Sequence, residues 1–208
     1  MEEKVIYTAF RIFLNRIDSY AIMKEGLNEY FVIKKGIYPD LLIKHINGES
    51  TIGVFQLSHA SNVKWVCWDF DSGENKSIED VFEEAKKLFS FLKNKGYHPL
   101  LEFSGMKGYH VWIFCQPTNA KNAKEFAEKM CNESGIHPHE IFPKQIILKE
   151  NGYGCMVKLP LGIHRVSRKR SIIYNNNFEE LNLDNAINRL LNQKINKIPT
   201  YIKKLSSF

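Results

Sequence analysis

Residues 63–71 constrain the fold of this chain more than any other part of the sequence. They are mostly β-branched or aromatic until Asp69 and Asp71 appear, and Ser72-Gly73 then breaks the run. Such a run is typical of a buried strand. Because side chains alternate along a strand, Asp69 and Asp71 point to one face and Phe70 points to the other. The segment therefore predicts a core strand that ends in two converging carboxylates.

Helix and strand signals alternate after this segment. Ser77 followed by Asp80 predicts a capped helix start, and apolar residues at helical spacing continue that helix to Gly96. Residues 99–103 and 109–114 predict two strands around a turn at 104–108, and residues 120–131 predict a second helix. Short strands are expected at 139–142 and 155–160. Together these strands complete one sheet with helices on one face.

The two ends of the chain carry other patterns. Apolar residues spaced three and four apart predict a helix within residues 5–23. Turn signals separate short predicted strands at 30–33, 41–43 and 54–56. Residues 184–206 predict a C-terminal helix.

Composition bounds the class of protein. The chain has 208 residues, enough for one domain or two closely packed halves, and a net charge of +6, which suits a polyanionic partner. No apolar stretch is long enough for a membrane span, and the first residues lack the layout of a signal peptide. Four scattered cysteines without a C-x-x-C pair fit reduced thiols. We expect a cytoplasmic protein with no membrane partner.

Three acidic residues are candidates for metal binding. Asp69 and Asp71 repel each other unless a cation lies between them, and oxygen-only ligands suit Mg²⁺ or Mn²⁺. Glu140 begins a predicted strand and offers a third oxygen ligand. Three carboxylates can hold the two ions that phosphoryl chemistry uses. Taken alone, an exposed acidic strand end explains the aspartate pair equally well.

The turn Ser104-Gly105-Met106-Lys107-Gly108, followed by His110, resembles a phosphate cradle. Its glycines let backbone N–H groups approach a phosphate, and the hydroxyl and imidazole add polar contacts. The spacing matches neither a Walker loop nor a dinucleotide fingerprint. As a lone motif, a tight hairpin explains it as well.

Taken in order, these motifs resemble those of the archaeo-eukaryotic primase superfamily. The matching segments are Asp69-Phe70-Asp71, then residues 104–110, then Glu140-Ile141-Phe142-Pro143-Lys144-Gln145. Residues 15–21, Gly152-x-Gly154 and residues 157–165 extend the likeness over about residues 10–170. It is greatest to CRISPR-associated primase-polymerases and to the primase domains of related conflict systems.

The resemblance implies an α/β (α+β) catalytic core. This core would span residues 1–183. A smaller N-terminal α/β unit would occupy about residues 1–60, and an RRM-like antiparallel sheet with flanking helices would occupy about residues 61–183. Residues 184–208 would form a C-terminal helical segment outside the core. Asp69, Asp71 and Glu140 would be catalytic and would ligate two Mg²⁺ or Mn²⁺ ions. Several relatives have aspartate where this chain has Glu140. The implied nucleotide-binding residues are Ser104, Gly105, Lys107, Gly108, His110, Lys144, Lys158, His164 and Arg165.

The implied activity is that of a DNA-directed primase-polymerase. It would synthesise and extend primers on single-stranded DNA from dNTPs or NTPs by two-metal-ion nucleotidyl transfer, and the likeness also implies CRISPR adaptation proteins as partners. A metal-dependent nuclease or phosphohydrolase is one alternative, and a non-catalytic RRM-like nucleic-acid-binding module is another. The three tryptophans are expected in the core, and Tyr109 is the candidate for base stacking. Arg16 and Tyr20 lie in a family-like segment, where helix packing explains them equally well.

Overall fold

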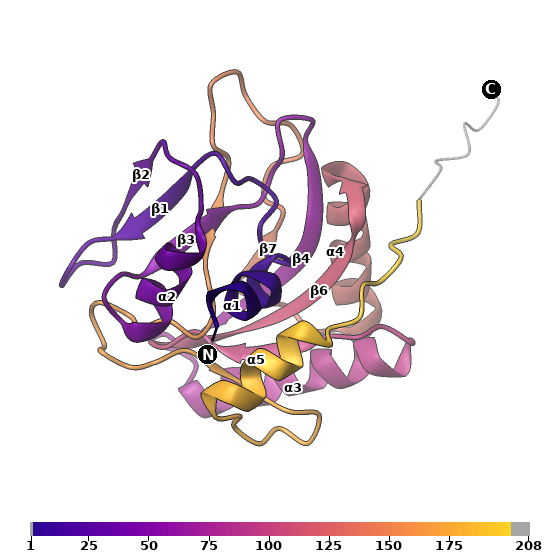
Figure 1. Cartoon of the computed structure of the whole chain (residues 1–208). Helices are drawn as coiled ribbons and strands as arrows, with labels where there is room; N and C mark the ends of the chain where they lie inside the picture. Colours follow the sequence, from indigo (N-terminus) through magenta and orange to yellow (C-terminus); the bar gives the residue numbers. More distant parts are fainter. Residues whose placement is uncertain (1, 201–208) are drawn as a thin grey trace.

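The computed structural model describes residues 2–200 (Figure 1). The helices in that range are α1 (Glu3–Phe10), α2 (Pro39–Asn47), α3 (Ile78–Asn94), α4 (Ala120–Ser134) and α5 (Leu183–Leu191). The strands are β1 (Tyr20–Met23), β2 (Tyr30–Ile33), β3 (Ile52–Phe55), β4 (Asn62–Asp71), β5 (Leu100–Phe103), β6 (Gly108–Asn119), β7 (Glu140–Phe142), β8 (Met156–Lys158) and β9 (Ile172–Ile173). None of these helices combines the length and apolar character that crossing a membrane requires. The predicted α/β (α+β) class is confirmed.

The strands form two antiparallel sheets. One has the order β2-β1-β3-β8, and the other has the order β7-β4-β6-β5-β9. The prediction that residues 155–160 join the sheet of residues 63–71 is wrong, because β8 pairs with β3 and places Lys158 opposite Gly53. Gly53 has no side chain, and the Met156 sulfur fills the space that a Cβ atom would need. β8 thus brings the chain back to the N-terminal sheet.

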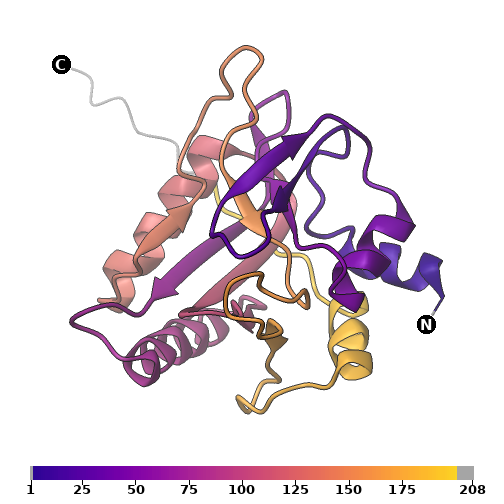
Figure 2. The ribbon, with the colours of Figure 1, turned by 90° about the vertical axis from the view of Figure 1, so that its left-hand side faces the viewer.

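The five-stranded sheet is covered on both faces (Figure 2). Alternation along β4 sends Trp68 and Phe70 to the face that packs on α3 and α4, and sends Trp65 and Cys67 to the face that packs on α1 and α5. All three tryptophans are fully buried, as expected for core residues. The same alternation confirms that Phe70 lies on the face opposite to Asp69 and Asp71.

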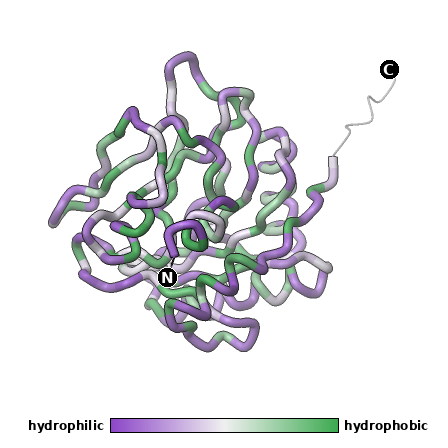
Figure 3. The backbone as a smooth tube through the Cα atoms, viewed as in Figure 1, coloured by the Kyte–Doolittle hydropathy of each residue, from purple (hydrophilic) through white to green (hydrophobic). Residues whose placement is uncertain are grey.

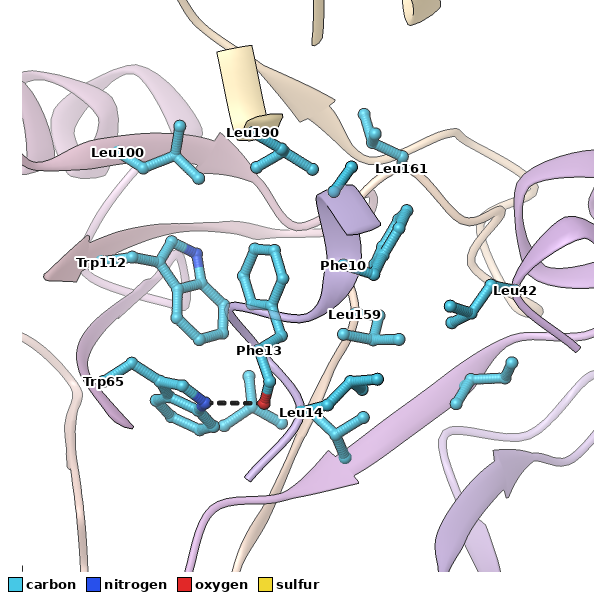
Figure 4. Close-up of a cluster of buried hydrophobic side chains, with 14 of the residues drawn as sticks. Phe10, Phe13, Leu14, Leu42, Trp65, Leu100, Trp112, Leu159, Leu161 and Leu190 are labelled. Carbon is cyan, nitrogen blue, oxygen red and sulfur yellow. Dashed lines mark hydrogen bonds between the residues drawn. The ribbon is translucent and has the colours of Figure 1, made fainter. Parts of the chain in front are cut away.

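An aromatic cluster joins the N-terminal segment to this sheet (Figure 4). The Trp65 Nε1–H donates a hydrogen bond of 2.9 Å to the Phe13 carbonyl. The Phe13 ring meets the Trp112 ring edge to face, with 5.2 Å between centroids. Hydrophobic positions gather along the strands and the inner sides of the helices (Figure 3). The two sheets therefore share one apolar core.

The predicted helices after residues 77 and 120 are confirmed. α3 begins with the capping box, in which the Ser77 hydroxyl accepts from the Asp80 N–H at 3.0 Å. α4 ends where Gly135 adopts the left-handed conformation with φ 70°.

The terminal predictions need correction. The helix predicted within residues 5–23 ends at Phe10, and Tyr20 belongs to β1, because pairing with β2 and β3 decides the conformation there. Residues 41–43 lie in α2 and not in a strand, since Pro39 starts a helix that ends at Gly48. The C-terminal helix ends at Leu191, and residues 201–206 of the predicted helix lie outside the described residues.

The chain beyond α5 follows the edge of β6 instead of continuing as a helix. The Asn196 side chain donates to the Phe114 carbonyl at 2.9 Å, and the Gln193 side chain donates to the His98 carbonyl at 2.8 Å. These amide contacts replace helical hydrogen bonds.

Candidate active site

A row of ionisable side chains crosses four strands of the five-stranded sheet. In the strand register, Asp69 lies opposite both Glu140 of β7 and His110 of β6, and His110 lies opposite Glu102 of β5. Directly opposite residues share a face of an antiparallel sheet. The row Glu140, Asp69, His110, Glu102 therefore points toward the N-terminal sheet.

A cavity of about 280 Å³ lies over this row, between the two sheets. Eight of the predicted site residues line it: Asp69, Asp71, Ser104, Lys107, His110, Glu140, Lys158 and His164. Asn28 of the β1–β2 connection and Tyr30 of β2 line it as well, with Met156 and Val157 of β8. The predicted residues Gly105, Gly108, Lys144 and Arg165 are not in its lining.

Asp69 is the most buried of the three predicted metal ligands. Burial raises its pKa, against the opposing effect of the His110 charge. The His110 Nε2 atom lies 3.5 Å from Asp69 Oδ1, which is longer than a hydrogen bond. Among the described residues, Oδ1 is thus a buried oxygen without a hydrogen-bond partner.

Lysines hold the other two carboxylates. The Lys107 ammonium lies 2.9 Å from Asp71 Oδ2, and this contact raises the pKa of Lys107. Lys144 forms an ion pair with Glu140, four residues earlier in the chain. Lys144 therefore reaches the site through Glu140, although it does not line the cavity.

The turn after β5 requires its glycines. Gly105 has φ 92°, and a Cβ atom there would crowd the Lys169 carbonyl at 3.1 Å. Gly108 lies opposite Asp71, and a Cβ atom there would overlap the Phe70 carbonyl. These glycines shape the turn and allow the close approach of β6 to the end of β4.

Glu102 organises the inner end of the row. It is fully buried and accepts hydrogen bonds from His110 Nδ1 at 3.0 Å, Trp112 Nε1 at 2.9 Å and the Ser171 hydroxyl at 2.6 Å. Burial opposes ionisation, but His110 and Lys158 outweigh it and lower the pKa of Glu102 to about 2. In turn, Glu102 and Asp69 raise the pKa of His110 against the effect of burial. The Nδ1 of His110 thus lies against Glu102, and its Nε2 faces Asp69 at the cavity.

The basic residues at the end of β8 and after it divide into two groups. Lys158 is buried 3.6 Å from Glu102 Oε1, and burial lowers its pKa despite that carboxylate. Burial lowers the pKa of His164 to about 4, and its Nδ1 accepts from the Val166 N–H at 3.2 Å, so the Nε2 carries the proton. Arg165 instead lies 3.3 Å from Glu25, on the β1–β2 turn.

Sequence reasoning missed Glu102, Asn28 and Tyr30 as site residues. An acidic residue inside the apolar strand of residues 99–103 was the available signal for Glu102, because a buried carboxylate needs partners. Tyr109 was expected to stack on bases, and this is wrong. Its ring is buried on the face that packs on α3 and α4 and stacks on Phe82, with 4.7 Å between centroids.

The three carboxylates have the oxygen-only chemistry that suits Mg²⁺ or Mn²⁺. The unpartnered Oδ1 of Asp69 favours a cation beside it. Within residues 2–200, no three acidic, histidine or cysteine side chains form a ready-made metal cluster. Asp71 and Glu140 are paired with lysines, so the residues fit divalent ions when those two pairs open.

The fold that carries this site is similar to the folds of two solved structures. The AEP domain of the cyanophage S-2L primase-polymerase is 12% identical, with a TM-score of 0.50 over 91% of this chain and 98% of that chain. The polymerase domain of Mycobacterium tuberculosis Ligase D, solved in complex with DNA, is 13% identical, with a TM-score of 0.53 over 90% of this chain and 86% of that chain. At these identities the likeness shows the fold alone.

The family model described as "TOTE conflict system, Archaeo-Eukaryotic Primase domain" matches residues 34–200. The chain belongs to this family, which confirms the predicted superfamily. No protein of curated function matches the sequence.

Proposed function

We propose that the chain is a DNA-directed primase-polymerase that synthesises and extends primers on single-stranded DNA from nucleoside triphosphates. The observation that carries the proposal is the cavity of about 280 Å³ between the sheets. It is lined by all three predicted metal ligands and by five predicted triphosphate-binding residues. Membership of the primase family supports the same activity.

Each group in the cavity has a role that its environment favours. Two Mg²⁺ or Mn²⁺ ions would be held by Asp69, Asp71 and Glu140 and, when bound, would neutralise the triphosphate and favour ionisation of the primer 3′-hydroxyl. A protonated His110 and a neutral His164 would each carry an Nε2–H that can donate to phosphate oxygens.

Lysines and the turn of residues 104–108 provide the remaining groups for binding the triphosphate. When the metal ions take up Asp71 and Glu140, Lys107 and Lys144 are freed to bind phosphate. Lys158 adds a positive charge from the opposite sheet, and the Ser104 hydroxyl adds a donor. The triphosphate is thereby enclosed by donors from both sheets.

The remaining wall of the cavity is neutral. Asn28, Tyr30, Met156 and Val157 line it and offer amide, phenol and apolar contacts. Such groups suit a base and a sugar better than a phosphate. We propose that this wall receives the nucleoside part of the incoming nucleotide.

The alternatives have less support. A nuclease has little need for the donors that surround the phosphate end of the cavity. A non-catalytic module would read bases on exposed aromatic residues, but the tryptophans and Tyr109 are buried. The matching family description names a TOTE conflict system and gives no support to a partnership with CRISPR adaptation proteins.

The test is synthesis on a primer-free single-stranded template with labelled dNTPs or NTPs and Mg²⁺ or Mn²⁺. The wild-type chain is compared with Asp69→Ala/Asp71→Ala and with the control Asp40→Ala/Asp184→Ala, which removes two exposed aspartates outside the cavity. We expect product from the wild type and the control alone.

Each outcome has a definite meaning. Product only on a primed template would restrict the activity to extension. Absence of product with and without a primer, or equal product from Asp69→Ala/Asp71→Ala, would refute the proposal. Release of mononucleotides without synthesis would favour the nuclease.

A further inference from the structure

A second cavity, of about 590 Å³, lies beside the N-terminal sheet. Its walls come from the segment before β1, from the end of β2, from His59 and from residues 148–153. Arg16, whose role the sequence left open between function and packing, forms part of this cavity. The proposed nucleotidyl transfer uses none of these residues.

Arg16 builds the floor of the second cavity. Its side chain is 4% exposed and donates to both carboxylate oxygens of Asp18, at 3.0 and 2.7 Å. It also donates to the Gly152 carbonyl at 3.1 Å, and its guanidinium lies 5.2 Å from the centroid of the Tyr153 ring. Arg16 is therefore a positioning residue that ties residues 148–153 to the N-terminal segment.

The rim of the second cavity carries free positive charge. Lys34 and Lys149 are exposed, and neither has an ion-pair partner in the part of the chain that the structure describes. Arg16 offsets the charge of Asp18, so Glu150 is the acid that opposes these two lysines. His59, with Nε2 3.3 Å from Asp18, adds charge when it is protonated. The positive side chains of this cavity outnumber the negative ones, and this excess of positive charge favours an anionic ligand.

Segments that are adjacent along the chain line the two cavities. Residues 143–155 connect β7 to β8, and both of these strands contribute residues to the first cavity. Within this connection, residues 148–153 line the second cavity. Tyr30 lines the first cavity and Lys34 the second, and four residues of extended chain span about 13 Å. A strand of a few nucleotides covers such a distance.

The same connection exposes apolar side chains. Ile146 is 39% exposed and Ile147 is 70% exposed. The connection projects from the molecule in both views (orange in Figures 1 and 2). Exposed isoleucines beside lysines suit contact with unstacked bases, as apolar wedges do in other nucleic-acid-binding proteins.

We propose that the second cavity and Ile146–Ile147 form a groove for single-stranded nucleic acid that leads to the first cavity. The sugar-phosphate backbone contacts Lys34, Lys149 and His59, and the bases contact the two isoleucines. The inference rests on the proposed function, because the bound strand is the template of that reaction.

The test measures binding of a labelled oligothymidine by fluorescence anisotropy over a series of salt concentrations. Lys34→Ala/Lys149→Ala is compared with Lys93→Ala/Lys121→Ala, which removes two exposed lysines that line neither cavity. Each phosphate contact contributes about 0.7 to the slope of log K against log salt concentration for a single strand, so the first variant should lose about 1.4. The control should keep the wild-type slope. Equal slopes for the two variants, or no binding by the wild type, would overturn the groove.

A second pair of variants tests the apolar part. Ile147→Ser should bind the oligonucleotide several-fold more weakly with an unchanged slope, and Ile195→Ser, at a side chain that is 43% exposed, should bind normally. Equal affinities would contradict the assignment. Binding of a labelled dNTP should be unchanged in all four variants.

Failure of the groove and failure of the proposed function are distinguishable. If the oligonucleotide binds with the expected slopes but no strand is synthesised, the groove is supported and the proposed polymerase activity is refuted. If the wild type synthesises strands but both lysine variants have equal slopes, the polymerase activity is supported and the groove is refuted.

Discussion

Replacement of Glu102 by glutamine should have two effects: it should destabilise the protein, and it should displace the His110 side chain. The carboxylate accepts hydrogen bonds from His110, Trp112 and Ser171, and it faces the buried Lys158 at 3.6 Å. Glutamine has the same shape but offers one acceptor oxygen and an NH₂ donor. At least one donor in this buried network would then face another donor.

The magnitude follows from the environment of the carboxylate. The pKa of Glu102 falls from 4.5 to about 2, which corresponds to roughly 3 kcal/mol of stabilisation at neutral pH. Glutamine loses this interaction and leaves the Lys158 charge without its partner. We expect the free energy of unfolding at pH 7 to fall by about 3–5 kcal/mol, the usual cost of breaking a buried ion pair. Because the pKa is lowered on folding, the stabilisation is present above about pH 4.5 and is lost as the pH falls toward 2.

Urea unfolding followed by circular dichroism measures this loss. Glu102→Gln is compared with the wild type and with Glu74→Gln, at an exposed glutamate, at pH 7 and at pH 4. The difference should be smaller at pH 4, and the folded variant should bind a labelled dNTP more weakly. A loss below about 1 kcal/mol at pH 7, within the range of ordinary substitutions, would refute the reasoning.

Three further predictions concern the scaffold of the site. Burial lowers the pKa of His45 to about 3, so the protein should lose roughly 2 kcal/mol of stability between pH 6.5 and pH 5, as the unfolded chain takes up a proton. Urea unfolding of His45→Gln should lack this pH dependence. Gly108→Ala should lower the melting temperature and abolish nucleotide incorporation, because the new Cβ atom overlaps the Phe70 carbonyl, and normal incorporation would contradict this. Trp65→Phe leaves the buried Phe13 carbonyl unpaired and should cost about 1–3 kcal/mol in chemical denaturation, whereas an unchanged midpoint would show that the 2.9 Å bond is dispensable.

Sequence patterns predicted elements well where neighbours along the chain decide the conformation. The alternation that places Asp69 and Asp71 on one face is a property of any strand, and the Ser77–Asp80 box needs only one helical turn. The same reasoning failed for Tyr20, whose spacing from Phe13 fits a helix. Strand pairing across the sheet overrides that local spacing.

The sequence by itself determined which chemical groups this protein brings to its site: three carboxylates, a glycine turn with a histidine, and the lysines that follow. Only the tertiary structure decided how these groups pair. It places Glu102 beneath His110, turns Arg165 away to Glu25, and carries β8 to the other sheet so that Lys158 faces the row of β4 and β6. The physical reason is that a buried charge takes its partner from strand register and sheet packing, and these depend on contacts between distant segments that no local window of sequence contains.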